Sequence, residues 1–300
     1  MTFAQTSSEL KKIYSSFRLE EKLRIDTGNK ELINKGLFNI HRFAVDKGGN
    51  IYVLNPKNRE AMIFVLNRTG KLVRSFARQG QGPGELDNPF EMFLTPEGNI
   101  LVLDPRRAKV SFFNREGSCL KEINSLPEVL FIHPLADGKY IGLESIYGAE
   151  AKDWGYTLNY YDEDFKKIKE LDRLTFPNPI PTKTVEASLH VIFSEVSGNR
   201  NYSAFAERGY EFLIFDLMRE FLKRITVPYR KITDLTEYKK IMEEEIGGLS
   251  RFGVNVVYPK YVLPFHSYFA DENGYLFVMT FEPGKRLKPG DYMLFNFLIF

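Results

Sequence analysis

The chain contains an internal repeat, and a repeat of this kind restricts the possible folds more than any other feature of a sequence. The segment GNIYVLNP starts at Gly49, and the similar segment GNILVLDP starts at Gly98. Each is followed by an apolar run that ends in Asn-Arg-x-Gly, at Gly70 and Gly117, and then by one further short run. One unit therefore holds four short β-runs separated by turn residues, which is the pattern of a four-stranded antiparallel sheet.

Weaker copies follow, anchored on the turn glycines Gly138, Gly198 and Gly274. A period of about 40 to 50 residues, without alternation of strands and helices, predicts an all-β fold, a β-propeller of four-stranded antiparallel blades. We expect one domain over residues 1–300, with an N-terminal tail at 1–17. The blades that are visible in the sequence lie at about 40–76, 88–123, 129–172, 185–227 and 262–300.

The turn and linker residues of the first two units resemble those of the NHL-repeat family. The pattern D-x-x-G-N-I-Y-V at 46–53, followed by Asn58-Arg59, is similar to the NHL repeat, and G-Q-G-P-G-E-L at 80–86 is similar to the connection between NHL blades. The resemblance is strong over 40–123 and fades towards residue 300. It implies a six-bladed propeller of the type found in secreted or periplasmic bacterial proteins.

The end of the chain suggests that the fifth blade is incomplete. The letters FLIF at 212–215 precede the turn residue Asp216, whereas the same letters at 297–300 have no turn residue after them. We therefore expect the fifth blade to stop at its third strand, without its outer strand. The segment Arg18 to Ile25 is expected to be the ring-closing outer strand of a further, sixth blade whose other three strands are absent from the chain. Five of six blades would leave an open wedge and weak order at 290–300.

Charge and hydropathy exclude several classes of partner. The chain has 41 basic and 39 acidic residues, a net charge of +2, so we expect no binding of nucleic acid through bulk electrostatics. No apolar run approaches the roughly 18 to 20 residues of a transmembrane segment. Cys119 is the single cysteine and cannot form an internal disulfide. Thr2-Phe3-Ala4 resembles the end of a signal-cleavage site, and together with the NHL resemblance it favours an extracytoplasmic location.

The connections between blades point to one functional face. In a propeller the connection from an outer strand to the next inner strand lies on one face, which here carries the linker at 78–89, the FPNPIP stretch at 176–181 and a helical insertion at 230–252. Loops of this length are more often functional than idle. We assign to this binding face the following residues: Arg42, Arg78, Gln79, Glu85 and Tyr238.

The insertion at 230–252 contains the clearest predicted helix of the chain. Asp234 or Thr236 is the candidate N-cap, and Gly247-Gly248 is the stop signal. Apolar residues recur at helical spacing, so one side of the helix is expected to rest on the propeller: Leu235, Tyr238, Met242 and Ile246. The helix is either a lid over a ligand or an insertion that only covers strand ends.

The four histidines are expected on the inner strands of four different blades. His41, His190 and His266 each stand eight residues before a turn glycine, and His133 stands five before one. Several imidazoles at one end of a narrow channel could ligate a divalent metal, zinc or calcium, which would be the candidate cofactor. The recurrence can also reflect packing, because Phe90 occupies the equivalent position of the second blade.

Two functions remain open. No GxSxG, HExxH, Walker or CxxC motif occurs, and no catalytic residue can be assigned. The leading hypothesis is a non-enzymatic binding scaffold whose loop-rich face receives a peptide, glycan or protein partner. The alternative is a metal-dependent lyase or hydrolase that uses the channel histidines.

Overall fold

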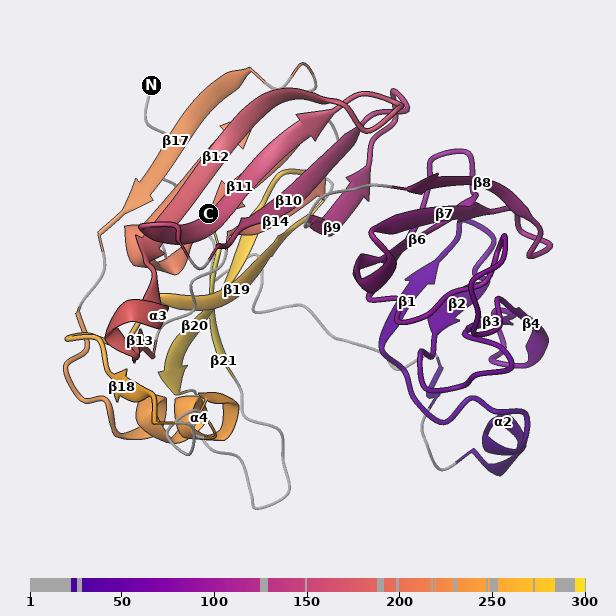
Figure 1. Cartoon of the computed structure of the whole chain (residues 1–300), viewed down its shortest axis with the longest axis horizontal. Helices are drawn as coiled ribbons and strands as arrows, with labels where there is room; N and C mark the ends of the chain where they lie inside the picture. Colours follow the sequence, from indigo (N-terminus) through magenta and orange to yellow (C-terminus); the bar gives the residue numbers. More distant parts are fainter. Residues whose placement is uncertain are drawn as a thin grey trace. The chain divides into compact units, whose positions relative to one another are not determined.

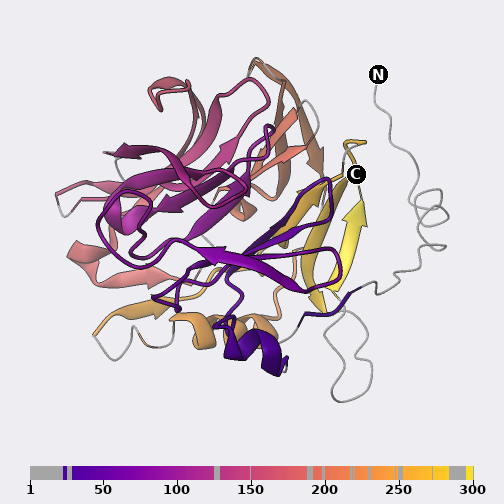
Figure 2. The same cartoon turned by 90° about the vertical axis from the view of Figure 1, so that its right-hand side faces the viewer.

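The computed structural model describes residues 23–299 of the chain, with the exception of 26–28, 125–128, 149, 188–191, 198–199, 217, 219, 229–230, 247, 249–252, 272 and 284–294. The chain divides into two compact units, Met1–Tyr140 (unit 1) and Ile141–Phe300 (unit 2). Twisted antiparallel sheets make up most of the regular structure of each unit (Figures 1 and 2). Among the described residues no helix is long and apolar enough to cross a membrane.

Unit 1 contains the two sheets of the strong repeat. In both sheets the strands follow one another in chain order, and the first strands of the two sheets, β1 and β5, lie next to each other. The first sheet consists of β1 (Arg42–Val45), β2 (Ile51–Leu54), β3 (Ile63–Leu66) and β4 (Leu72–Phe76). The second consists of β5 (Glu91–Leu94), β6 (Ile100–Asp104), β7 (Lys109–Phe113) and β8 (Cys119–Asn124), with the 3-10 turn η1 (Pro105–Arg107).

The turn between the first two strands explains why the repeat tolerates Thr95 where the first unit has Asp46. The Asp46 carboxylate accepts hydrogen bonds from the amides of Gly48 and Asn50. In the second sheet the Thr95 hydroxyl accepts the corresponding bond from the Asn99 amide at 3.2 Å. Either side chain therefore closes the turn, and what the turn requires of both units is a glycine at positive φ.

Strands β2 and β3 are buried on both faces, as expected of strands inside a stack of sheets. One face packs against the second sheet in a cluster that includes Tyr52, Ile63 and Phe113. The other face packs against the N-terminal segment, where helix α2 (Lys30–Asn34) contributes Leu32 to a cluster with Phe64. Residues 18–22 of the predicted ring-closing strand lie outside the described residues, and the described part, 23–25, is not in a strand.

The third sheet has the order β12-β11-β10-β9, and the division between the units falls within it at Tyr140. Its strands are β9 (Val129–Pro134), β10 (Tyr140–Ile146), β11 (Asp153–Tyr161) and β12 (Lys167–Pro177). Strands β11 and β12 are long, as Figure 1 shows, and β12 runs past the expected end of the blade at 172.

Unit 2 also holds the fourth and fifth sheets, whose first strands β14 and β19 lie next to each other. The fourth sheet consists of β14 (Phe193–Ser197), β15 (Arg200–Ala204), β16 (Tyr210–Phe215) and β17 (Phe221–Val227), with η2 (Ala206–Arg208). The fifth has three strands, β19 (Phe265–Ala270), β20 (Leu276–Pro283) and β21 (Phe295–Ile299). The β-propeller of antiparallel sheets is thus confirmed. Of the segment 290–300, residues 290–294 and 300 lie outside the described residues.

The insertion contains a helix and packs against the segments next to it. Helix α4 (Thr236–Ile246) begins where it was predicted, and the Asp234 carboxylate accepts a hydrogen bond from the Thr236 amide at 3.0 Å. After the short helix α3 (Pro179–Thr182), β13 (Thr184–Glu186) pairs in parallel with β18 (Asn255–Val257). Tyr238 and Met242 of α4 pack in a cluster beneath the helix. The apolar side of α4 therefore rests on the protein, as expected.

Candidate functional site

The linker between the first two sheets is folded around the carboxylate of Glu85. This carboxylate accepts hydrogen bonds from the Gly82 amide and from the Arg78 guanidinium, each at 2.7 Å. The Leu86 amide donates to the Arg78 carbonyl at 3.0 Å and closes the loop. At Gly80 a Cβ would collide with the Glu85 carboxylate in its present position. These hydrogen bonds therefore hold the glycine-rich linker in one ordered conformation.

The loop turns its carboxylates inward and its arginines outward. The Gly82 amide and the Arg78 guanidinium hold the pKa of Glu85 below its usual value. The Glu85 side chain is 19% exposed, whereas the side chain of Arg78 is 72% exposed. The same arrangement recurs next to it, where Arg106 is exposed and lies 3.6 Å from the mostly covered carboxylate of Asp87. This end of unit 1 thus presents guanidinium groups to solvent.

In each of the first two repeats, the residue that follows the G-N-I-x-V-L motif forms a hydrogen bond with the chain segment that precedes its sheet. Asp104 accepts hydrogen bonds from the amides of Asp87 at 2.6 Å and Asn88 at 3.2 Å. Asn55, the equivalent residue of the first sheet, donates from its side chain to the Gly36 carbonyl at 2.8 Å. Both side chains are fully buried. The residue type follows the partner, because amides need an acceptor and a carbonyl needs a donor.

Arg42 bridges the first strands of the two sheets in unit 1. Its guanidinium makes two hydrogen bonds to the almost fully buried Glu91, at 2.9 and 2.8 Å, and its Cζ lies 5.3 Å from the centre of the Phe90 ring. The bond to Glu91 raises the pKa of Arg42. Arg42 therefore holds β1 against β5, and its side chain remains 40% exposed.

Two of the four histidines are described in full, and both pack against aromatic rings. His41 stands directly before β1, with its Nε2 atom 3.1 Å from the Phe90 carbonyl oxygen and its ring centre 5.2 Å from that of Phe90. His133 lies in β9, and its ring centre is 5.2 Å from that of Phe93. Position and environment agree with the packing interpretation of the histidine pattern.

The other two histidines do not test the pattern. His266 lies in β19, and His190 is outside the described residues. In the part of the chain that the structure describes, no group of three or more His, Cys, Asp or Glu side chains is close enough together to hold a metal ion. The histidine site for zinc or calcium therefore stays a prediction.

The remaining residues assigned to the binding face differ in accessibility. Gln79 is exposed, and its backbone N–H donates to the Arg59 carbonyl at 2.7 Å. Tyr238 is 2% exposed, and its hydroxyl donates to the Ala187 carbonyl at 2.7 Å. Its assignment to the binding face needs correction, because Tyr238 uses both its ring and its hydroxyl to attach α4 to the protein.

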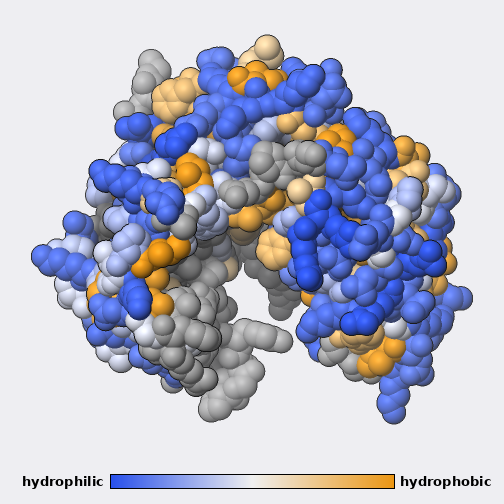
Figure 3. Space-filling view, in the orientation of Figure 1, coloured by the Kyte–Doolittle hydropathy of each residue, from blue (hydrophilic) through white to orange (hydrophobic). Residues whose placement is uncertain are grey.

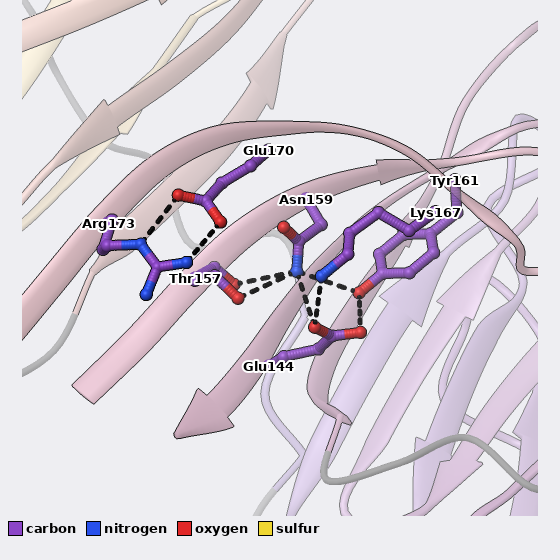
Figure 4. A network of polar contacts seen from close by, with 7 residues as sticks. All are labelled: Glu144, Thr157, Asn159, Tyr161, Lys167, Glu170 and Arg173. Carbon is purple, nitrogen blue, oxygen red and sulfur yellow. Dashed lines mark hydrogen bonds and ion pairs between the residues drawn. The ribbon is translucent and has the colours of Figure 1, made fainter. Parts of the chain in front are cut away.

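The third sheet carries a polar network that was not expected from the sequence (Figure 4). The Glu144 carboxylate accepts hydrogen bonds from Asn159 at 2.9 Å, from the Tyr161 hydroxyl at 2.6 Å and from Lys167 at 3.1 Å. The Asn159 side chain also donates to the Thr157 hydroxyl at 2.9 Å. Burial and the neighbouring carboxylate raise the pKa of Tyr161 far above its usual value, so that this hydroxyl remains a donor.

This network connects three strands of the sheet. Glu144 lies in β10, Asn159 and Tyr161 lie in β11, and Lys167 lies in β12, so that one carboxylate joins all three. The sequence does contain a signal for it, since Thr157, Asn159 and Tyr161 alternate along the strand with Leu158 and Tyr160, which are buried between them. Polar residues at a period of two inside a buried strand indicate a hydrogen-bonded layer.

Glu195 is the carboxyl group with the most unusual environment. It lies in β14, the first strand of the fourth sheet, and burial raises its pKa to about 7. Its ladder partner is Tyr202, whose carbonyl accepts a hydrogen bond from the buried Tyr268 hydroxyl at 2.8 Å. Among the described residues, no group forms a hydrogen bond or ion pair with the Glu195 carboxyl. A carboxyl group with a pKa near neutrality is found at functional sites and also in strained cores.

Comparison with solved structures supports the fold. A protein of Bacteroides fragilis that carries the description of an exported protein is 15% identical, with a TM-score of 0.53, over 82% of this chain and 66% of that one. This chain thus spans slightly less than two thirds of that protein. A protein of unknown function from Bacteroides caccae (12% identity, TM-score 0.43, 81% and 70% covered) and virginiamycin B lyase from Staphylococcus aureus (11%, 0.36, 68% and 73%) are less similar. No curated protein sequence gives a significant match.

The family is shown by the sequence itself. A family model described as a 6-bladed beta-propeller matches residues 4–253, which is most of the chain. Within each unit, the antiparallel sheets with neighbouring first strands agree with that description. The finer resemblance to NHL repeats stays a prediction. The chain belongs to this family of 6-bladed β-propellers.

Proposed function

We propose that the chain is a non-enzymatic binding scaffold whose partner, a peptide, glycan or protein, is received by the loop-bearing ends of the sheets. The observation that carries this proposal is the ordered linker of unit 1, at residues 78–89. Its carboxylates are used internally, while the exposed guanidinium groups of Arg78 and Arg106 are held on an ordered backbone. A loop that is already ordered loses little conformational entropy when it binds.

Three groups that an enzyme could use, His41, His133 and Glu144, support the same proposal, because they are engaged in contacts within the protein. The rings of His41 and His133 lie against Phe90 and Phe93, and the Glu144 carboxylate is surrounded by donors. An extracytoplasmic location is part of the proposal. It is supported by the small residues at the N-terminus and by the description of the similar Bacteroides fragilis protein as exported.

Removal of two exposed charges tests the binding face. We expect the Arg78→Ala, Arg106→Ala double variant to bind arrayed peptides or glycans about tenfold more weakly than the wild type, since each exposed guanidinium contributes about 0.7 kcal/mol to a contact. The matched control is Lys47→Ala, Lys71→Ala, which also removes two exposed cations but from the turns at the opposite end of the first sheet. An equal loss in both variants, or no binding to either array, would contradict the proposal.

Metal analysis tests the alternative function. Protein purified without an affinity tag and dialysed against zinc or calcium is expected to retain well under one equivalent of metal. The reason is that His41 and His133 each pack against a phenylalanine ring and belong to no cluster of metal-ligating side chains among the described residues. Elemental analysis measures this directly. A stoichiometric metal that is lost in a His41→Ala, His266→Ala variant would instead favour the metal-dependent lyase or hydrolase.

A further inference from the structure

The loop-bearing end of the third sheet carries four clustered aromatic side chains. Trp154 of β11 and Phe176 of β12 stand directly opposite each other in the ladder. The Tyr156 ring lies one ladder step further along the same face, with its centre 6.2 Å from that of Phe176. Tyr147 joins from the end of β10, with its ring centre 4.9 Å from that of Trp154. We call these four residues the aromatic platform.

Hydrogen bonds fix the rings of the platform in place. The Tyr147 and Tyr156 hydroxyls are 2.5 Å apart, and the Trp154 indole N–H donates to the Gly148 carbonyl at 2.9 Å. The buried Asn178 side chain donates to the same carbonyl at 3.2 Å and to the Ala151 carbonyl at 2.7 Å. The connection from β10 to β11 is thereby tied to the end of β12, so the platform is ordered before a ligand arrives.

The platform is not part of a core. The Tyr147 side chain is 42% exposed, and Trp154, Tyr156 and Phe176 are each partly exposed. Ile180, just beyond the platform in α3, is also exposed. Large rings that remain partly in water would gain free energy from further burial. A rigid, partly exposed aromatic surface is therefore typical of a binding site.

The chemistry of the platform favours a neutral saccharide. Its four side chains are uncharged, and they combine apolar aromatic rings with the phenolic oxygens of Tyr147 and Tyr156. A pyranose ring has a complementary form, with C–H groups on one face, which pack on an aromatic ring, and hydroxyl groups around its rim. Tyrosine and tryptophan provide such contact area at a low cost in side-chain entropy.

A peptide that adds as a strand fits the same region less well. Strand β12 is the outer strand of the sheet, but its edge carries Lys167, Lys169 and Arg173. The β11–β12 ladder also contains register shifts at 158/159 and 160/161. Charges and irregular ladders hinder strand addition, and the surface over β12 is largely hydrophilic in Figure 3. The site available for recognition is the platform and not the edge.

We propose that the aromatic platform, Tyr147, Trp154, Tyr156 and Phe176, binds the pyranose rings of a neutral oligosaccharide. This inference rests on the proposed function as a binding scaffold, and it narrows the partner to a glycan. The FPNPIP stretch then acts as the support of the platform through Phe176 and Asn178.

The chain offers a direct reporter for this site, because Trp154 is its single tryptophan. The full chain is titrated with hexasaccharides of β-1,4-glucan, α-1,4-glucan, β-1,4-mannan and β-1,4-xylan, and the tryptophan emission is recorded. We expect a saturable change with at least one of them. Calorimetry on the same sugar then compares variants. Tyr147→Ala and Phe176→Ala are expected to weaken binding about tenfold each, which corresponds to about 1.4 kcal/mol.

Two further variants separate binding from folding. Tyr147→Phe retains the ring and should retain most of the affinity, whereas Phe269→Ala removes an exposed aromatic ring elsewhere in unit 2 and should change nothing. The unfolding midpoint of every variant is measured alongside. No saturable change with any of the four sugars would overturn the proposal, as would unchanged affinity in both alanine variants. Peptide binding that still depends on Arg78 and Arg106 would then leave the proposed function standing.

Discussion

The Lys109→Met variant is expected to unfold with a free energy about 3 kcal/mol below that of the wild type, because it leaves a covered carboxylate without its cation. Lys109 is 6% exposed, and its ammonium group donates to Glu122 at 2.8 Å and to the Glu85 carbonyl at 2.7 Å. Burial acts to raise the pKa of Glu122, but the bonds from Lys109 and from the Gly84 amide outweigh it and hold this pKa below its usual value. Urea unfolding of the whole chain measures the loss.

Two controls show whether the uncompensated charge causes this loss. Lys35→Met is the same substitution in an exposed ion pair with Glu31, and it should cost no more than about 0.5 kcal/mol. Lys109→Met combined with Glu122→Leu removes both charges and should recover part of the stability. If Lys109→Met lowered the free energy of unfolding as little as Lys35→Met, the stability of the protein would not depend on the Lys109–Glu122 ion pair.

Glu195→Gln is expected to make the protein more stable at pH 8, by roughly 2 to 3 kcal/mol, while leaving it nearly unchanged at pH 4. The pKa of Glu195 is about 7 in the folded protein, against an ordinary value of 4.5. A raised pKa means that the folded state holds its proton more firmly. The contribution of Glu195 to the free energy of unfolding is therefore fully present below pH 4.5. It is lost as the pH rises from 4.5 to 7 and stays absent above pH 7.

Urea unfolding of the wild type and the variant at several pH values tests this prediction. Glutamine cannot ionise, so the variant should lack the decline between pH 4.5 and 7. The matched control is Glu220→Gln, which neutralises an exposed glutamate in the same unit and should follow the wild type. Parallel curves for Glu195→Gln and the wild type would show that the Glu195 carboxyl ionises in the folded protein as it does in water.

The repeat was predictable because its turns depend on local chemistry. Gly49 and Gly98 both adopt a positive φ, at 81° and 84°, and glycine is the residue that does so without strain. The strands between such turns are short and apolar, so their number and order follow from the spacing. The length of β12 could not be predicted in the same way, because its extension beyond 172 depends on the contacts of Trp154 and Phe176 across the ladder.

The candidate sites were less predictable, because they depend on contacts between residues that are distant in the sequence. Arg42 pairs with Glu91, and Lys109 pairs with Glu122, across strands whose register the sequence does not state. Tyr238 was assigned to the binding face from its position in an exposed insertion. Its helical spacing with Met242 already indicated burial, and the structure follows that spacing.

The segment that contains α2 also determines where stacking of sheets ends in unit 1. Leu32 and Leu37 occupy the face of the first sheet formed by Val53, Phe64 and Leu66. Any further sheet, whether from this chain or from another copy, has to displace these side chains before it can pack there. In unit 1 the residues before the first repeat therefore cover an apolar face of the first sheet that would otherwise be open to an incoming strand or sheet.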